Sequence, residues 1–331
     1  MIINRVDTNK VPVRVKRVKE IIRETDFFSL CILSDGVYAA IAKPGQGAWS
    51  NAGIVDLGEG LLIFDSFATP SAGYELRKQA EDLTGKKVRY LINSHYHGDH
   101  VFGNQIFSDT TIISTSLTRK WFEENNKIVD LNQEIEETEE YLKKLKEQIG
   151  VTADRFMKES LTSQYKEMSA ILKDLPTMKL VFPAVLFEEK LVIEGSKRKV
   201  ELNCFGGGHT PSDTFLYLPE EKVGFMGDLV TVDLHLPIYD PEEFSTILEK
   251  VKLLDMETVV PGHGYPGGNE LLCTMEKYLA FLIGKTKEAV KNNVSLEDFV
   301  SNLEIPDPYT EWRGVNGIRG NLSKVYAYYS E

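Results

Sequence analysis

The sequence has few cysteines, few histidines and no long apolar run. Its 331 residues include only three cysteines, which are widely spaced: Cys31, Cys204 and Cys273. This number is too small for a disulfide framework, so we expect reduced thiols. No apolar segment approaches the roughly 20 residues that a membrane span requires, and the N-terminal segment lacks the apolar core of a secretory signal. The sequence therefore predicts a cytoplasmic protein with no membrane partner.

An excess of positive charge is also missing. The chain has 38 lysines and arginines against 50 aspartates and glutamates, which gives a net charge of −12. Because such a chain repels a polyanion at long range, we expect no nucleic-acid partner. A basic segment near the N-terminus alternates with valines and is explained more simply as the solvent face of a strand: Arg14, Lys16, Arg17 and Lys19.

The six histidines are distributed unevenly along the chain. Three of them lie in the peptide SHYHGDH, residues 94–100, directly after a β-branched and apolar run that is typical of a strand. Residues two apart in an extended chain project to the same side, so His95 and His97 can bind one ion. Asp99 and His100 would turn toward a second ion. Imidazole nitrogens and carboxylate oxygens are ligands of Zn²⁺, and the peptide therefore predicts half of a metal site.

Three further polar residues occur in the same setting, beside glycines at the end of a strand-like run: His209, Asp228 and His263. A single histidine of this kind is more commonly a loop residue than a ligand. Here, however, five of the six histidines fall at predicted strand ends, and only His235 is left over. We therefore predict that these three residues complete the metal site.

The order and spacing of these residues resemble the metallo-β-lactamase fold superfamily over most of the chain. Asp65, in the peptide LLIFDS, matches a further motif of that family. The resemblance implies an α+β fold, an αββα sandwich of two mixed sheets flanked by helices, as one domain over residues 1–331. The metals would lie at one edge between the sheets.

The resemblance also implies a role for each candidate residue. The first metal would be held by His95, His97 and His209. The second would be held by Asp99, His100 and His263. Asp228 would bridge the two metals, and Asp65 would support the site without binding a metal.

Two zinc ions per chain would make the protein a hydrolase. A hydroxide held between two Zn²⁺ ions is available near neutral pH, and the ions polarise the bond under attack. Asp99 is the expected catalytic residue, because it could orient the hydroxide and accept its proton. Asp65 could fix the tautomer of a ligating imidazole. No G-x-S-x-G motif supports a serine nucleophile, and we expect a small ester, thioester, lactone or amide substrate.

Several alternatives remain open at this point. His97 replaces the glutamate of the diiron flavoproteins of the superfamily, which favours zinc, although iron or manganese also accept such ligands. Asp228 replaces the cysteine of true class-one β-lactamases, and His100 replaces their arginine. This combination of Asp228 and His100 is instead similar to the pattern in hydroxyacylglutathione hydrolases and related thioesterases, lactonases and phosphodiesterases. The alternatives to a zinc hydrolase are a mononuclear iron persulfide dioxygenase-like enzyme, a phosphodiesterase and a non-catalytic metal-stabilised binding protein.

The segment 118–176 departs from the rest in composition, because it is rich in Glu and Lys and poor in glycine. Apolar residues three and four apart predict a helix that ends at Gly150. A second helix would be capped by Thr152 and would end at Pro176. We expect an antiparallel hairpin inserted into the main domain. It would either pack as a purely structural element, cover the metal site as a lid, or form a homodimer surface.

Candidate substrate-pocket residues are supported by weaker patterns. Four aromatic or polar residues lie near the expected loops around the metals: Trp49, Asn51, Trp121 and His235. Near the C-terminus, three further residues could meet an anionic substrate: Trp312, Arg313 and Arg319. The identity of the substrate does not follow from any of them, since loops rather than metal ligands set selectivity.

Overall fold

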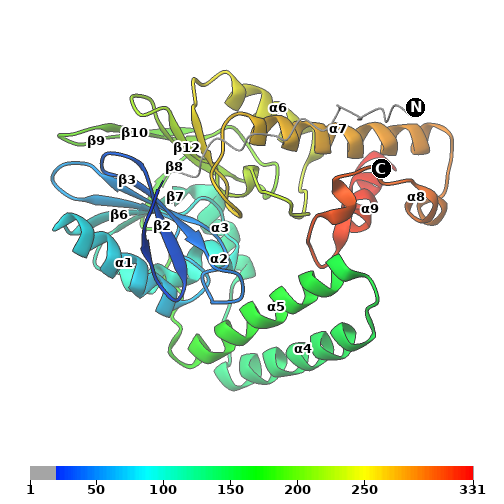
Figure 1. The fold of residues 1–331 in the computed structure, drawn as a ribbon, viewed down its shortest axis with the longest axis horizontal. Helices are drawn as coiled ribbons and strands as arrows, with labels where there is room; N and C mark the ends of the chain where they lie inside the picture. Colours follow the sequence, from blue (N-terminus) through cyan, green and yellow to red (C-terminus); the bar gives the residue numbers. More distant parts are fainter. Residues whose placement is uncertain (1–19, 331) are drawn as a thin grey trace, which may run out of the picture.

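The structure, a computed structural model, describes residues 20–330, and the basic segment at positions 14–19 lies outside them. Within the described part, the centre of the molecule is a pair of sheets (Figure 1). The first sheet has eight strands, in the order β1 (Ile21–Glu24), β2 (Phe28–Ser34), β3 (Val37–Ala42), β4 (Ala52–Asp56), β5 (Leu61–Phe64), β6 (Val88–Ile92), β7 (Thr111–Thr115) and β8 (Val185–Phe187). The second has five, in the order β13 (Thr258–Val260), β12 (Val223–Phe225), β11 (Thr214–Leu218), β10 (Lys199–Cys204) and β9 (Lys190–Glu194).

Both sheets are mixed. Strands β1 to β5 pair antiparallel, whereas β5, β6, β7 and β8 pair parallel. In the second sheet, β9 to β12 are antiparallel and β12 pairs parallel with β13. Parallel neighbours end at the same edge of a sheet. The polar residues that follow β5 and β6 therefore lie together, and so do those that follow β12 and β13.

The central strands are apolar on both faces because both sides of each sheet are covered there, and every residue of β4, β5, β11 and β12 is buried. In β5, Leu62 and Phe64 face the second sheet, while Leu61 and Ile63 face the helical layer. Phe64 meets Phe225 of the other sheet with ring centroids 6.1 Å apart. This alternation places one hydrophobic core between the sheets and one under each helical layer.

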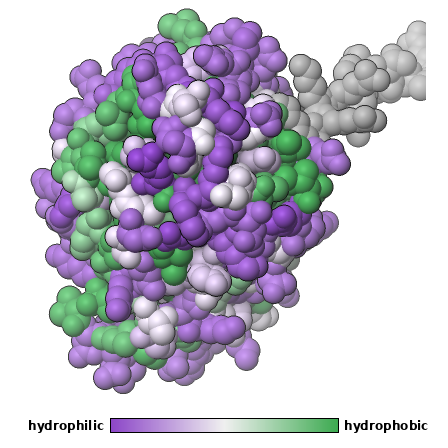
Figure 2. Space-filling model, turned by 90° about the vertical axis from the view of Figure 1, so that its left-hand side faces the viewer, coloured by the Kyte–Doolittle hydropathy of each residue, from purple (hydrophilic) through white to green (hydrophobic). Residues whose placement is uncertain are grey.

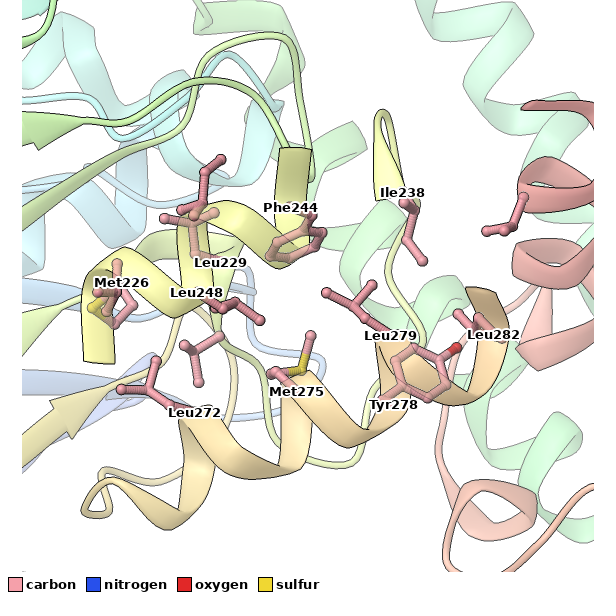
Figure 3. Packing of buried hydrophobic residues seen from close by; sticks show 14 of the residues in the cluster. Met226, Leu229, Ile238, Phe244, Leu248, Leu272, Met275, Tyr278, Leu279 and Leu282 are labelled. Atoms are coloured by element: carbon pink, nitrogen blue, oxygen red, sulfur yellow. The ribbon is translucent and has the colours of Figure 1, made fainter. Parts of the chain in front are cut away.

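Helices cover the outer faces. Helix α1 (Pro70–Thr84) packs on the first sheet; it begins at the cap Thr69, whose side chain accepts the Ala72 N–H, and is followed by Gly85 in the left-handed conformation. Helices α6 (Pro241–Lys252) and α7 (Glu270–Lys291) cover the second sheet, and Figure 3 shows their apolar side chains packed face to face. The predicted αββα sandwich is therefore confirmed.

The remaining elements are short or C-terminal. Helix α8 (Leu296–Asn302) packs against α9 (Gly317–Ser330), and α9 packs against α7. The short helices are α2 (Gly98–Val101), η1 (Phe102–Phe107), η3 (Gly227–Leu229) and η4 (Tyr309–Glu311).

Three helices connect β7 to β8: α3 (Ser116–Asn125), α4 (Leu131–Val151) and α5 (Arg155–Asp174), followed by η2 (Leu175–Thr177). Helices α4 and α5 pack together as a hairpin, with α5 between α4 and the sandwich (Figure 1). Two predicted details are wrong. Helix α4 continues through Gly150 to Val151, and Thr152 follows it rather than capping α5. The cap of α5 is Asp154, whose carboxylate accepts the Met157 N–H.

No helix within residues 20–330 is long and apolar enough to cross a membrane. The three cysteines are free thiols, and Cys31 and Cys204 are buried in the core between the sheets. The face in Figure 2 is mainly hydrophilic, with hydrophobic residues in separate groups.

Candidate metal centre

Strand ends from both sheets bring the predicted ligands to one edge of the sandwich. Asp65 follows β5, and the peptide 94–100 follows β6. On the other sheet, His209 lies in the loop between β10 and β11, Asp228 lies in η3 directly after β12, and His263 follows β13. The site therefore depends on the packing of the two sheets against each other, which holds these strand ends next to one another.

The ligand atoms form two groups, in each of which they lie within 4.8 Å of one another. The first group contains His95, His97, His209 and Asp228; the second contains Asp99, His100 and His263. In the first group, His97 Nδ1 lies 3.1 Å from His95 Nε2 and 3.0 Å from His209 Nε2. In the second group, Asp99 Oδ2 lies 3.3 Å from His263 Nε2 and 3.6 Å from His100 Nε2.

Asp228 lies between the two groups. Its Oδ2 is 3.4 Å from His209 Nε2 and 3.7 Å from His95 Nε2. Its Oδ1 is 3.3 Å from both His100 Nε2 and His263 Nε2. The chain approaches this carboxylate so closely that a Cβ atom at Gly262 would lie 2.0 Å from Oδ1, so glycine is required beside His263.

Three buried atoms at the second group lack a hydrogen-bond partner among the described residues: His100 Nε2, His263 Nε2 and Asp228 Oδ1. Buried polar atoms almost always have a partner, and their exceptions require an explanation. All three atoms converge on the same place and are of the types that bind Zn²⁺. The donor set therefore fits a cation at this position.

The electrostatics of the two groups are different. Burial, together with the nearby His209, lowers the pKa of His97 to about 3, so its ring stays neutral as a metal ligand must. Burial also lowers the pKa of His263, but the carboxylates of Asp228 and Asp99 outweigh it and raise this pKa to about 10. Burial disfavours the charged Asp228, yet the positive charges of His263 and His100 hold its pKa well below the usual range. The second group thus requires positive charge, supplied either by protons or by a cation.

The ligating rings are held by hydrogen bonds at their other nitrogens. His209 Nδ1 donates to Pro237 O at 2.7 Å, and His263 Nδ1 donates to Trp49 O at 3.1 Å. Because a carbonyl can only accept, these bonds fix the proton on Nδ1 and leave Nε2 free for a metal.

Asp65 supports the second group without joining it. Its Oδ2 lies 2.8 Å from His100 Nδ1 and accepts the Ser94 hydroxyl, and its Oδ1 accepts the Ser94 N–H. Both oxygens are therefore used by donors. The backbone of Asp65 lies in the left-handed region, with φ of 63°, which is an uncommon conformation for a non-glycine residue and marks a tightly constrained turn.

Replacing Asp65 by asparagine is expected to lower zinc affinity by about 10- to 100-fold, because an amide N–H would face a donor in either orientation. Competition with a zinc chelator measures this change. The matched control is Asp56→Asn. Asp56 is also buried but pairs with Lys86 and Lys197 and contacts none of the candidate ligands. An unchanged zinc affinity in Asp65→Asn would contradict the supporting role.

Sequence reasoning missed two buried carboxylates beside the site. Asp213 accepts the N–H groups of Gly208, His209 and Thr210 at 2.8 to 3.1 Å and so shapes the loop that carries His209. The sequence feature that could have identified Asp213 is its position four residues after His209, which follows three glycines. Glu167, on α5, accepts the N–H groups of Gly45 and Gly47. The sequence feature that could have identified Glu167 is its position next to Met168, which belongs to the apolar face of α5.

A cavity of about 680 Å³ adjoins the metal centre, and five of the candidate ligands line it: His97, Asp99, His209, Asp228 and His263. Trp49 and His235 also line it. Both ring nitrogens of His235 are used within the fold, since they lie 2.7 Å from the Tyr278 hydroxyl and 3.0 Å from Tyr309 O. His235 therefore serves the packing of the C-terminal helices.

The structure does not bring the other pocket candidates to this cavity. The Asn51 side chain donates to Pro261 O and Gly264 O and so joins two loops. Trp121 packs against Tyr96, with ring centroids 5.6 Å apart. Trp312 is buried among aromatic rings, Arg313 lines two neighbouring pockets and Arg319 is exposed.

A family model described as the metallo-beta-lactamase superfamily matches residues 49–263, well over half of the chain. The chain therefore belongs to this superfamily, which consists mostly of metal-dependent hydrolases. It is 29% identical over 84 residues to the Beta-lactamase-like protein 2 homolog of Caenorhabditis elegans. That match covers 25% of this chain and 28% of the relative's length.

Solved structures have the same fold at low identity. A metallo-beta-lactamase from Pontibacter korlensis is 18% identical, with a TM-score of 0.56, over 76% of this chain and 98% of that one. The sec-alkylsulfatase Pisa1 from Pseudomonas sp. is 17% identical, with a TM-score of 0.65, over 91% of this chain and 50% of that one. Likeness at this level establishes the fold alone.

Proposed function

We propose that the protein is a dinuclear zinc hydrolase that cleaves an ester, thioester, lactone or amide bond of a small molecule. The placement of Asp228 carries the proposal, because its two carboxylate oxygens face two separate groups of ligands. A carboxylate in this position can join two cations. A site with a single ion, as in an iron persulfide dioxygenase, would leave the atoms of the second group without a partner.

The residues of the chain divide the work of such a reaction. Zinc ions at the two groups would supply a nucleophile from water at neutral pH and polarise the bond under attack. Asp99 lines the cavity, and its side chain is 17% exposed. In the metal-free site burial favours the neutral form of Asp99, but the charges of His100 and His263 outweigh burial and lower its pKa. In the loaded site the zinc ions would supply this positive charge instead. Asp99 is therefore ionised, and it can orient the attacking water and accept its proton.

Nitrogen and oxygen ligands discriminate weakly between zinc, iron and manganese, and we propose zinc because His97 replaces the glutamate of the diiron members of the superfamily. The first group offers three imidazoles and one carboxylate oxygen, and the second offers two imidazoles and two carboxylates, counting Asp228 in both. With Asp228 counted in both, each set offers four protein ligands, so a water on either ion would be its fifth ligand.

The test is metal analysis of the purified protein followed by a substrate panel on the zinc-loaded form. We expect two zinc equivalents per chain and hydrolysis of at least one ester, thioester, lactone or amide. Phosphodiesters and alkyl sulfates belong in the panel, the latter because a sec-alkylsulfatase has this fold. One iron equivalent with oxygen uptake would favour the dioxygenase instead. Two bound zinc ions with no turnover of any substrate would favour a binding protein.

A further inference from the structure

The cavity beside the metal centre differs in character at its two ends. One end carries the candidate ligands, which are polar and charged. The rest of the wall is mainly apolar, with polar side chains such as Thr138 and Gln164 between the apolar ones. The apolar residues come from the hairpin and from the segments that face it: Trp49, Phe102, Met168, Ile171, Met178 and Leu236. Met168 and Ile171 lie on α5, so the inserted hairpin forms part of the wall.

The apolar wall is a packed surface of the protein. Ile171 and Met178 belong to one buried cluster, and Trp49, Phe102 and Met168 pack against this cluster while remaining partly exposed. An apolar ligand that covers these partly buried side chains removes their remaining surface from water. This burial contributes favourably to the free energy of binding.

The wall of this cavity carries little positive charge that could pair with an anionic group on the substrate. Among the described residues that line the cavity, Lys127 is the only lysine or arginine, and it is exposed. Glu134 of α4 is the acidic lining residue outside the metal centre. A carboxylate or phosphate placed against this wall would lose its hydration without a buried cation to compensate.

We propose that the substrate carries an uncharged apolar group, alkyl or aryl, on one side of the bond that is cleaved, and that α5 helps to select it. This inference rests on the proposed hydrolase function and specifies its substrate class. The group lies against Met168 and Ile171, while the bond to be cleaved lies at the metal ligands. Met168 is a specificity-determining residue, and the hairpin is a wall of the substrate site.

The first experiment compares acyl esters of one leaving group, from acetyl to octanoyl, on the zinc-loaded protein. Burial of one methylene predicts a gain in kcat/KM of about threefold to fourfold for each CH₂ until the cavity is filled. A substrate of hexanoyl length that ends in a carboxylate is expected to be at least about tenfold poorer than the hexanoyl ester. A flat dependence on chain length, or an equal rate for the carboxylate, would overturn the proposal while leaving the hydrolase function intact.

The second experiment measures binding without turnover. Calorimetry with 1-octanol and with ethanol compares the wild-type protein, Met168→Gln and Met168→Leu. Glutamine has the length of methionine but is polar, whereas leucine keeps the apolar character. We expect 1-octanol to bind wild type and Met168→Leu and to bind Met168→Gln at least about fivefold more weakly.

The two experiments fail separately. If no ester is hydrolysed but 1-octanol binds and Met168→Gln weakens it, the hydrolase function is wrong and the apolar site stands. If Met168→Gln lowers kcat/KM equally for every chain length and leaves 1-octanol binding unchanged, Met168 has only a structural role and the selection by α5 is refuted.

Discussion

Replacing Asp228 by asparagine is expected to reduce bound zinc from two equivalents to about one and to lower turnover more than 100-fold. Asparagine keeps the shape of the side chain but removes its charge. The Oδ1 atom of Asp228 faces His100 and His263, and Oδ2 faces His95 and His209. The asparagine amide has one oxygen and one NH₂ group in place of the two carboxylate oxygens, so one of the two groups loses a ligand. The effect should exceed the roughly 10- to 100-fold cost of losing an outer hydrogen-bond partner.

Metal content and kcat are measured on the same preparation, with Asp233→Asn as the matched control. Asp233 lies on the loop after Asp228, is exposed and has a positive φ of 51°, which asparagine also tolerates. The control should keep both zinc ions and full activity. If Asp228→Asn also retains both, then Asp228 does not bridge two metals.

The positions of the candidate ligands could be predicted from sequence because each lies in a segment that follows an apolar run and contains glycine. Strand ends of neighbouring parallel strands meet at one edge, so the pattern of β6 followed by histidines already implied convergence. The approach of His209, Asp228 and His263 to that edge required a second sheet facing the first. The sequence does not encode this packing locally, and the family resemblance supplied it.

The pocket residues were harder to predict, since their roles depend on contacts over long distances in sequence. Asn51 lies in a glycine-rich segment, but its side chain donates to carbonyl oxygens more than 200 residues away. His235 is near Asp228 in sequence, yet its ring is held by Tyr278 and Tyr309. The periodicity of segment 118–176 predicted two helices. It could not predict that α5 faces the cavity or that its buried glutamate meets a distant loop.

Replacing Glu167 by alanine is expected to lower the free energy of unfolding by about 2 kcal/mol at pH 7. The carboxylate accepts the N–H groups of Gly45 and Gly47, and the alanine variant leaves both without an acceptor. An unsatisfied buried N–H costs about 1–3 kcal/mol. Burial raises the pKa of Glu167 to about 6, and this cost of the charged form offsets part of the gain.

The pH dependence of this loss has a definite sign. The folded-state pKa of about 6 lies above the value of 4.5 for the free side chain, so the folded protein binds the proton more tightly. The contribution of Glu167 to stability is then largest below pH 4.5 and falls as the pH rises to about 6. Urea unfolding of metal-free wild type and Glu167→Ala should therefore differ more at pH 5 than at pH 7. A larger difference at pH 7 would contradict the raised pKa.

Glu167→Ala should also weaken the second metal. The loop that Glu167 holds continues to Trp49, whose carbonyl accepts His263 Nδ1–H, and to Ser50, whose hydroxyl donates to Asp99 O. A looser loop misplaces both ligands, and we expect about a tenfold weaker second zinc. The matched control is Glu159→Ala on the same helix. Glu159 pairs with Arg155 at the surface, where such a pair contributes little. Equal zinc affinity in the two variants would show that the hairpin does not support the metal ligands. Its role would then be limited to lining the cavity.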